Sequence, residues 1–203
     1  AAGHGVESGQ HAASLNAGAG NITITSDSVD LNGTLSGTAG LTIQPETAST
    51  TIGLGGGSGT LNLDDTELGF LQDGFSSITI GDAAAGTGAV DILTATFTDP
   101  LTVVGGSVTV NDLNAGSNDV TVTARTGNII DGGSANDITA GSLTLNAEAG
   151  DIAQAANPGA IEITATSLST DSTNGSNNGA QFVGAIGGTV SLTSIDAGTG
   201  TAT

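Results

Sequence analysis

Apolar and polar residues alternate in short runs along the whole chain, and these runs recur at a nearly constant interval. The strongest apolar–polar–apolar triplets are Ile22–Ile24, Leu41–Ile43, Leu61–Leu63, Ile78–Ile80, Leu101–Val103, Val120–Val122, Leu143–Leu145, Ile161–Ile163 and Val190–Leu192. Strict alternation is typical of a strand with one buried face. The average spacing of about 21 residues is too long for a hairpin and suits one turn of a solenoid.

Two pairs of similar segments show that the chain contains an internal repeat. VTVTARTGNI from Val120 aligns with LTLNAEAGDI from Leu143 at an offset of 23 residues. GGSVTVNDLNAGSN from Gly105 aligns with GGTVSLTSIDAGTG from Gly187 at an offset of 82 residues, roughly four periods. In the first pair, a Gly followed by Asn or Asp separates two alternating runs, which predicts strand, turn and strand.

These patterns predict an all-β fold, a parallel β-helix of about nine turns of roughly 21 residues. Weaker apolar stretches would supply second and third strands in each turn, as at Val29–Leu31, Leu68–Leu71, Val90–Ile92 and Val108–Val110. We expect no helices, because Gly interrupts every window of useful length and Thr, Ser and Val dominate the rest.

The repeat pattern divides the chain into two parts. Residues 1–20 lack periodicity and contain both His residues, so we expect a linker or a frayed first turn. Residues 21–203 form the repeat segment. Its longest interval contains the polar run TDSTNGSNNGA at 170–180, which predicts an insertion looping out of one corner. The first ten residues show no secretion-signal pattern, and the missing Met suggests a mature or excised piece.

Composition excludes several classes of partner. The formal net charge is −19 and Arg125 is the single Lys or Arg, so the chain has no basic surface for nucleic acid or for anionic membranes. No apolar run approaches the roughly 20 residues of a membrane helix, so we expect no membrane insertion. Aromatic residues make up 2%, so Val, Ile, Leu and Ala must fill the core.

The repeats resemble the β-helical regions of filamentous haemagglutinin-like exoproteins, bacterial surface proteins exported by two-partner secretion. The likeness lies in the corners Gly127–Ile129 and Gly150–Ile152, in AGSLTLNA from Ala140, and in the Gly, Thr, Asn and Val composition of residues 21–203. The resemblance implies a right-handed parallel β-helix, export across the outer membrane, and service as an adhesin or its stalk.

Catalytic constellations are weakly represented. GHG at Gly3–Gly5 is similar to a motif of β-helical polygalacturonases, with Asp64 and Asp65 as candidate paired carboxylates. The chain order is reversed from that family, and adjacent strand residues point to opposite faces. A polysaccharide lyase would need a cation to stabilise the enolate and usually an acidic metal cluster, and Arg125 is the single Lys or Arg. A Ser–His–Asp triad would need His4 or His11 to fold back onto the rod. We therefore predict a non-enzymatic protein with no catalytic residues.

Calcium is the one candidate cofactor, because the chain has 20 Asp and Glu carboxylates. GGSANDITA from Gly132, with Asp137, and GGSGTLNL from Gly56 each approach the calcium-binding nonapeptide of β-rolls. A true site needs ligands from successive turns, and no second copy follows either segment. We therefore expect no cofactor and no metal ligands, and interpret the acidic residues as solvated corners.

The polar residue at the centre of each triplet suggests a further function. These residues are Thr23, Thr42, Asn62, Thr79, Thr102, Thr121, Thr144, Glu162 and Ser191. Flat Thr ladders on β-helices bind ice, but a second Thr column two residues on is incomplete, with Gln44 and Asp64 among its members. A single Thr column is also what β-propensity produces on an exposed parallel sheet.

Taken together, the sequence predicts a secreted structural β-helix, the shaft or fibre of a bacterial surface adhesin or extracellular matrix fibre. The alternatives are a direct adhesin that binds a host or neighbouring-cell ligand through loops such as 170–180, and an ice-binding β-helix. Because neither end of the repeat shows a capping segment, we expect flanking repeats of the same polypeptide or end-to-end self-association into a filament.

Overall fold

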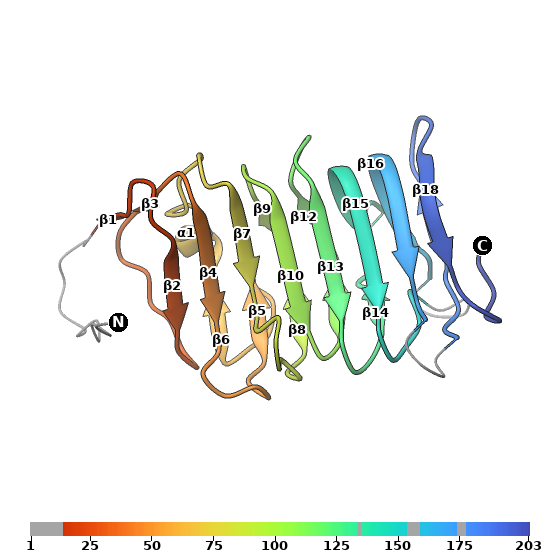
Figure 1. Cartoon of the computed structure of the whole chain (residues 1–203), viewed down its shortest axis with the longest axis horizontal. Coiled ribbons are helices and arrows are strands. Elements are labelled where there is room, and N and C mark those ends of the chain that lie inside the picture. The colour runs from red at the N-terminus through yellow and green to blue at the C-terminus, as the bar shows by residue number, and fades with distance from the viewer. Residues whose placement is uncertain (1–13, 134, 154–158, 174–177) are drawn as a thin grey trace.

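The structure is a computed structural model that describes residues 14–133, 135–153, 159–173 and 178–203. The chain forms a parallel β-solenoid of about seven turns, in which all strand pairs of the described residues are parallel. Figure 1 shows the strands of one face side by side along a rod, from β2 to β18. The all-β parallel solenoid predicted from the alternation is thereby confirmed.

The main sheet contains one strand from each successive turn. Its path runs through β2 (Ile22–Thr25), β4 (Gly40–Gln44), β7 (Ser77–Ile80), β10 (Leu101–Gly105), β13 (Val120–Ala124), β15 (Ile138–Ala147) and β16 (Ile161–Asp171), and β18 (Ser191–Asp196) pairs with β16. Six of the nine predicted triplets lie in register here, from Ile22–Ile24 to Leu143–Leu145, with Leu61–Leu63 excepted.

Shorter strands form the other faces of the solenoid. A second sheet contains β5 (Ile52–Leu54), β6 (Leu61–Leu63), β8 (Val90–Ile92), β11 (Val108–Val110) and β14 (Ile129–Asp131). A third face is formed by β9 (Ala95–Thr96), β12 (Leu113–Asn114), the first halves of β15 and β16, and β17 (Val183–Ala185). The strand β1 (Leu15–Asn16) pairs with β3 (Leu35–Ser36).

The number of turns is about seven, so the prediction of nine was wrong. Leu61–Leu63 is β6, which pairs with β5 in the second sheet. Ile161–Ile163 pairs with β17, and Ile163 pairs with Ile138 of β15, on the third face. Alternation shows that one side of a strand is buried, but all three faces of a solenoid give this pattern. Some turns contribute a triplet on more than one face, so the number of triplets exceeds the number of turns.

A short helix was also missed. α1 (Asp65–Leu68) lies where the sequence pattern predicted a corner and a strand, and it begins with a capping box. The Asp64 carboxylate accepts a hydrogen bond from Glu67 N–H, and the Glu67 side chain accepts one from Asp64 N–H. Val29–Leu31 forms no strand either, whereas Val90–Ile92 and Val108–Val110 are strands as predicted.

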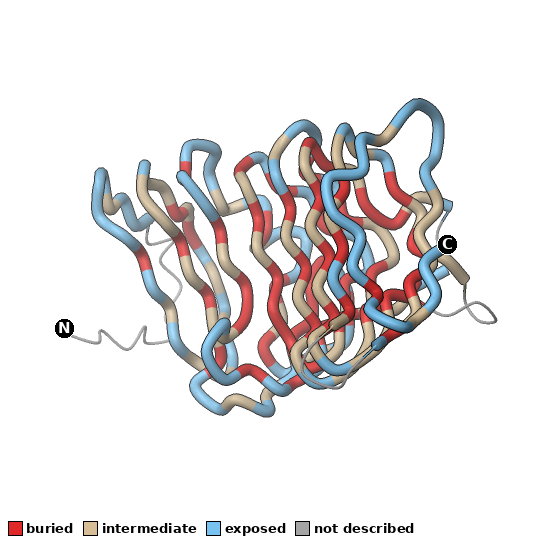
Figure 2. The backbone as a smooth tube through the Cα atoms, turned by 45° about the vertical axis from the view of Figure 1, so that its right-hand side comes forward, coloured by how far each residue is buried: buried red, intermediate tan, exposed pale blue. Residues whose placement is uncertain are grey.

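The core is a column of aliphatic side chains between the faces. Figure 2 shows buried residues alternating with less buried ones along the strands. Val122, Leu145 and Ile163 are all buried, as predicted, and Val122 pairs in register with Leu145. We expected Ile163 to stack on Leu145 in the next turn, but Ile163 pairs with Ile138 on the third face, so that expectation was wrong.

The predicted linker and insertion lie partly outside the described residues. Residues 1–13, with both His, and 174–177 are not described. Within 170–180, Thr170 and Asp171 continue β16, and Thr170 and Ser172 are buried. Thr170 Oγ1 donates a hydrogen bond to Gln181 Oε1, and Gln181 Nε2 donates to Ser172 Oγ at 2.9 Å. Such buried polar groups are tolerated because they are paired.

No described helix has the length and apolar composition needed to cross a bilayer.

Candidate metal centre

Three carboxylates converge where the chain passes from the second sheet to the third face. Asp131 ends β14, Asp137 precedes β15, and Glu162 is the second residue of β16 in the next turn. Because Ile138 pairs with Ile163, the register places Asp137 directly beside Glu162. One ligand atom from each of the three carboxylates lies within 4.8 Å of the other two. We call Asp131, Asp137 and Glu162 the acidic triad.

Backbone hydrogen bonds fix Asp137 in this position. Its N–H donates to Glu162 C=O at 2.8 Å, and its C=O accepts from Leu113 N–H at 2.8 Å. Asp137 Oδ2 accepts from Glu162 N–H at 2.8 Å, whereas the buried Oδ1 has no hydrogen-bond partner within residues 14–133, 135–153, 159–173 and 178–203. The carboxylate is therefore held between three successive turns with one oxygen unpaired.

Asp131 is fixed by a different local contact. Its Oδ1 accepts a hydrogen bond from Gly133 N–H, and its side chain is buried. A Cβ on Gly159, which has φ +156°, would lie 3.2 Å from Asp131 Oδ2. The absence of a side chain at Gly159 therefore leaves space next to the triad.

The electrostatics of the triad are unfavourable as long as all three groups are charged. Asp137 is 0% exposed and Asp131 4% exposed, while Glu162 is half-buried. Burial raises the pKa of the Asp137 carboxyl to about 7, and the negative charge of Asp131 adds to this effect. The hydrogen bond from Glu162 N–H acts in the opposite direction. A proton or a bound cation would relieve the repulsion.

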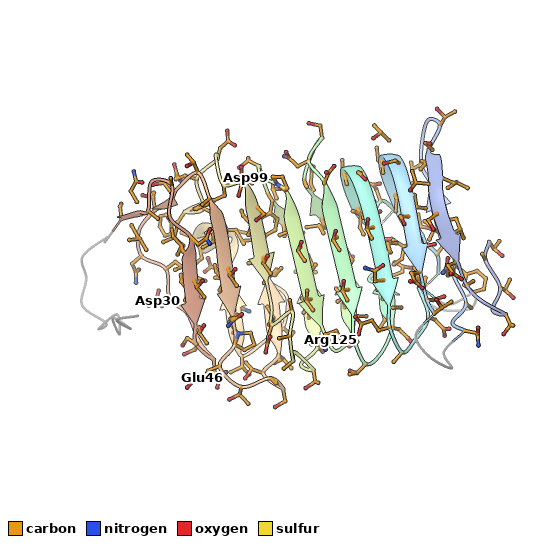
Figure 3. All side chains as sticks on the ribbon, in the orientation of Figure 1. Asp30, Glu46, Asp99 and Arg125 are labelled. Atoms are coloured by element: carbon orange, nitrogen blue, oxygen red, sulfur yellow. The ribbon has the colours of Figure 1, made fainter. Side chains whose placement is uncertain are left out.

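No Lys or Arg is left to neutralise the triad. Arg125, the single such residue in the sequence, follows β13, where Nε lies 3.9 Å from Glu148 Oε2 and Nη1 donates to Ala83 C=O. Figure 3 shows Arg125 near the ends of the main-sheet strands, at the opposite end from Asp99. Carboxylate oxygens are hard ligands, which Ca²⁺ and Mg²⁺ prefer.

Only Asp137 of the acidic triad is a candidate ligand in the sequence, where no metal site was expected. Asp137 was singled out within GGSANDITA, but no second copy of that motif followed. The partner from the next turn is instead Glu162, which lacks the motif and precedes an Ile as Asp137 does. That shared Asp/Glu–Ile pattern was the available signal, and it could be used only once the register of β15 and β16 was known.

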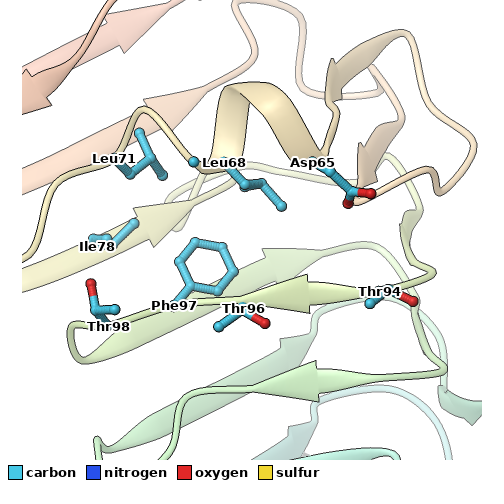
Figure 4. Close-up of a pocket in the computed structure, with 9 residues that line it drawn as sticks. Asp65, Leu68, Leu71, Ile78, Thr94, Thr96, Phe97 and Thr98 are labelled. Atoms are coloured by element: carbon cyan, nitrogen blue, oxygen red, sulfur yellow. The ribbon is translucent and has the colours of Figure 1, made fainter.

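The other candidate residues do not converge. At the second nonapeptide-like segment, the Asp91 carboxylate accepts a hydrogen bond from Ser58 N–H at 2.7 Å and so stabilises the loop. Asp64 caps α1, and Asp65 lies at the rim of a hollow of about 450 Å³ between α1 and β9 (Figure 4). This hollow is lined mainly by Leu, Ile, Phe and Thr side chains. His4, the other half of the glycosidase hypothesis, lies outside the described residues.

The outward Thr column is more regular than the sequence indicated. In register, the main sheet presents Thr23, Thr42, Thr79, Thr102, Thr121, Thr144, Ser169 and Ser194. Asn62 and Glu162, which seemed to interrupt the column, lie on other faces. The column two residues on remains mixed, with Gln44, Val104, Asn146 and Asp171 among its members.

No protein-family model, curated protein or solved structure matches this chain.

Proposed function

We propose that this chain is a non-enzymatic structural segment, a right-handed β-solenoid that serves as the shaft or fibre of a secreted bacterial surface adhesin or extracellular matrix fibre. The observation that carries the proposal is the main sheet, in which eight strands from successive turns align in parallel along one axis. Such a ladder transmits load along the rod through many parallel hydrogen bonds and repeats without a size limit.

The last strand supports extension of the rod by another turn. Leu192 of β18 pairs with Leu168, which pairs with Leu143, and these inner residues are 4% and 0% exposed. Leu192 is 66% exposed, and nearby Ile195 is 41% exposed. Another turn stacked on β18 would bury both side chains and pair the open edge of the strand. That turn would come from flanking repeats or from a second copy of the chain.

Negative-stain electron microscopy at increasing protein concentration, combined with hydrogen exchange, tests this proposal. We expect end-to-end filaments, or monomers whose β18 amides exchange much faster than those of β13. Leu192→Asp should abolish any filaments and leave the rod folded. Leu93→Asp is the control, because Leu93 is a 49%-exposed leucine at a middle turn. Dispersed monomers with β18 as protected as β13 would refute both forms of extension.

A direct adhesin remains the first alternative for the proposed shaft, with contacts made by the 170–180 region. Deleting 172–179 would disturb the fold as well as the loop, because Ser172 is buried and its hydroxyl donates to Gly179 C=O at 2.7 Å. Deleting 174–177 keeps both residues. Loss of adhesion in that variant would favour the direct adhesin, and full adhesion would favour the shaft.

The continuous Thr column favours ice binding as a second candidate function. Six Thr residues occupy the same outward position in six successive main-sheet strands, spaced by the roughly 4.8 Å between neighbouring strands. Thermal hysteresis of the purified chain tests this candidate. Thr102→Lys on the main sheet should abolish any hysteresis, whereas Thr109→Lys on the second sheet should not. Absence of hysteresis in the wild-type chain would exclude it.

A further inference from the structure

We propose that the acidic triad binds one calcium ion, which joins two successive turns of the solenoid through Asp131, Asp137 and Glu162. Calcium binding goes beyond the structural role proposed above and does not depend on it. Two independent observations carry the inference: the convergence of three carboxylates, and a buried Asp137 Oδ1 that no group of the described residues satisfies.

The ligand set of the triad suits calcium better than magnesium. Calcium takes about six to eight oxygen ligands in flexible geometry. Magnesium requires near-ideal octahedral geometry, keeps several waters and is usually bound through about one or two carboxylates. The triad offers three carboxylates whose ligand atoms lie within 4.8 Å of one another, and Asp131 and Asp137 are buried.

The position of the triad gives the ion a structural consequence. Asp131 and Asp137 belong to the segment joining β14 to β15, and Glu162 belongs to the following turn. A cation would convert repulsion among three carboxylates into attraction across this junction. The unfolded chain does not hold the three groups together, so calcium would stabilise the folded state selectively.

The test is calcium titration of the intact chain, prepared with a chelator and then desalted into about 150 mM NaCl to screen surface charge. Isothermal titration calorimetry should give one site. Millimolar CaCl₂ should raise the Tm, followed by circular dichroism since the chain has no Trp or Tyr, by about 5–10 °C. The same concentration of MgCl₂ should raise it less.

Conservative variants separate a bound ion from a structural role of the carboxylates. Asp137→Asn and Glu162→Gln should each abolish the calcium-induced shift in Tm. In calcium-free buffer both variants should melt at or above the wild-type temperature, because each removes one of the repelling charges. The control Asp112→Asn makes the same change of charge outside the triad and should retain the full calcium shift.

Three results would overturn the proposal. Absence of a calcium shift in the wild-type chain would mean that the triad is neutralised by a proton alone. An equal shift in wild-type, Asp137→Asn and Asp112→Asn would mean general screening of the acidic surface. A magnesium shift equal to or larger than the calcium shift would contradict the assignment of the ion.

Discussion

Leu145 and Thr144 are adjacent in β15, yet they lie in opposite environments. Leu145 is fully buried and pairs with Val122, whereas Thr144 faces outward beside Thr121. At the scale of single residues, stability therefore depends on which side of the strand a side chain occupies. The alternation in the sequence was enough to assign this side correctly at Val122, Leu145 and Ile163.

Replacing Leu145 with Asp would place an unpaired carboxylate in the core, which should lower the free energy of unfolding by at least about 4 kcal/mol. Thr144→Asp should cost less than about 1 kcal/mol, because the new side chain remains in water. Urea denaturation followed by circular dichroism measures both. Similar losses in the two variants would contradict the register of β15.

Asp99 predicts a pH dependence that is separate from the acidic triad. Burial raises the pKa of its carboxyl and Oδ1 accepts a hydrogen bond from Gly74 N–H, whereas the buried Oδ2 has no partner in the part of the chain that the structure describes. A raised pKa in the folded state means that the folded chain keeps this proton after the unfolded chain has lost it. The contribution of Asp99 to stability is therefore highest below its ordinary pKa of about 4 and falls as the pH rises above it.

Asp99→Asn should remove this dependence. The Tm of the variant minus the Tm of the wild-type chain should be smaller at pH 4 than at pH 7, because only the wild-type chain carries the buried charge at the higher pH. Thermal melts across this range check the sign. A difference that shrinks with rising pH would contradict the effect of burial. Because Asp137 is unchanged in both proteins, its own titration cancels in the comparison.

At the scale of elements, the alternation located strands well but not the face to which each belongs. Six triplets of the main sheet were found because each buries alternate residues against the core. β6 gave the same pattern from the second sheet, so its place depended on pairing with β5, a contact between segments that alternation does not encode. α1 was missed because it is one turn long, too short for a helical period to show, and its signal is the single capping pair Asp64 and Glu67.

The capping box gives an element-scale prediction. Asp64→Ala should destabilise the chain by about 1 kcal/mol, because Glu67 N–H loses its acceptor. The adjacent Asp65→Ala is the matched control and should have little effect, since Asp65 is exposed and makes no capping bond. Chemical denaturation distinguishes the two variants. Equal losses would mean that the helix contributes through general charge and not through its cap.

At the scale of the whole molecule, the sequence alone predicted a parallel solenoid with an aliphatic core but not its number of turns. The acidic triad was likewise predictable only in part. Asp137 lies in a recognisable motif, whereas Asp131 and Glu162 become its neighbours only through the winding of the chain. The Thr column became continuous for this reason too: assigning Asn62 and Glu162 to other faces removed its two interruptions. Long-range register is thus the information that the local pattern lacks.

The register between β4 and β7 tests the winding of the solenoid most directly, because 36 residues separate Thr42 and Thr79 and yet these two residues pair. The chain contains no Cys, so Cys pairs can be introduced without background reaction. A short bifunctional thiol reagent should cross-link Thr42→Cys with Thr79→Cys rapidly, because their strands are neighbours. It should not cross-link Thr42→Cys with Asn62→Cys, although these lie closer in sequence. Efficient cross-linking of the second pair and not the first, measured by mass spectrometry, would contradict the winding of the solenoid.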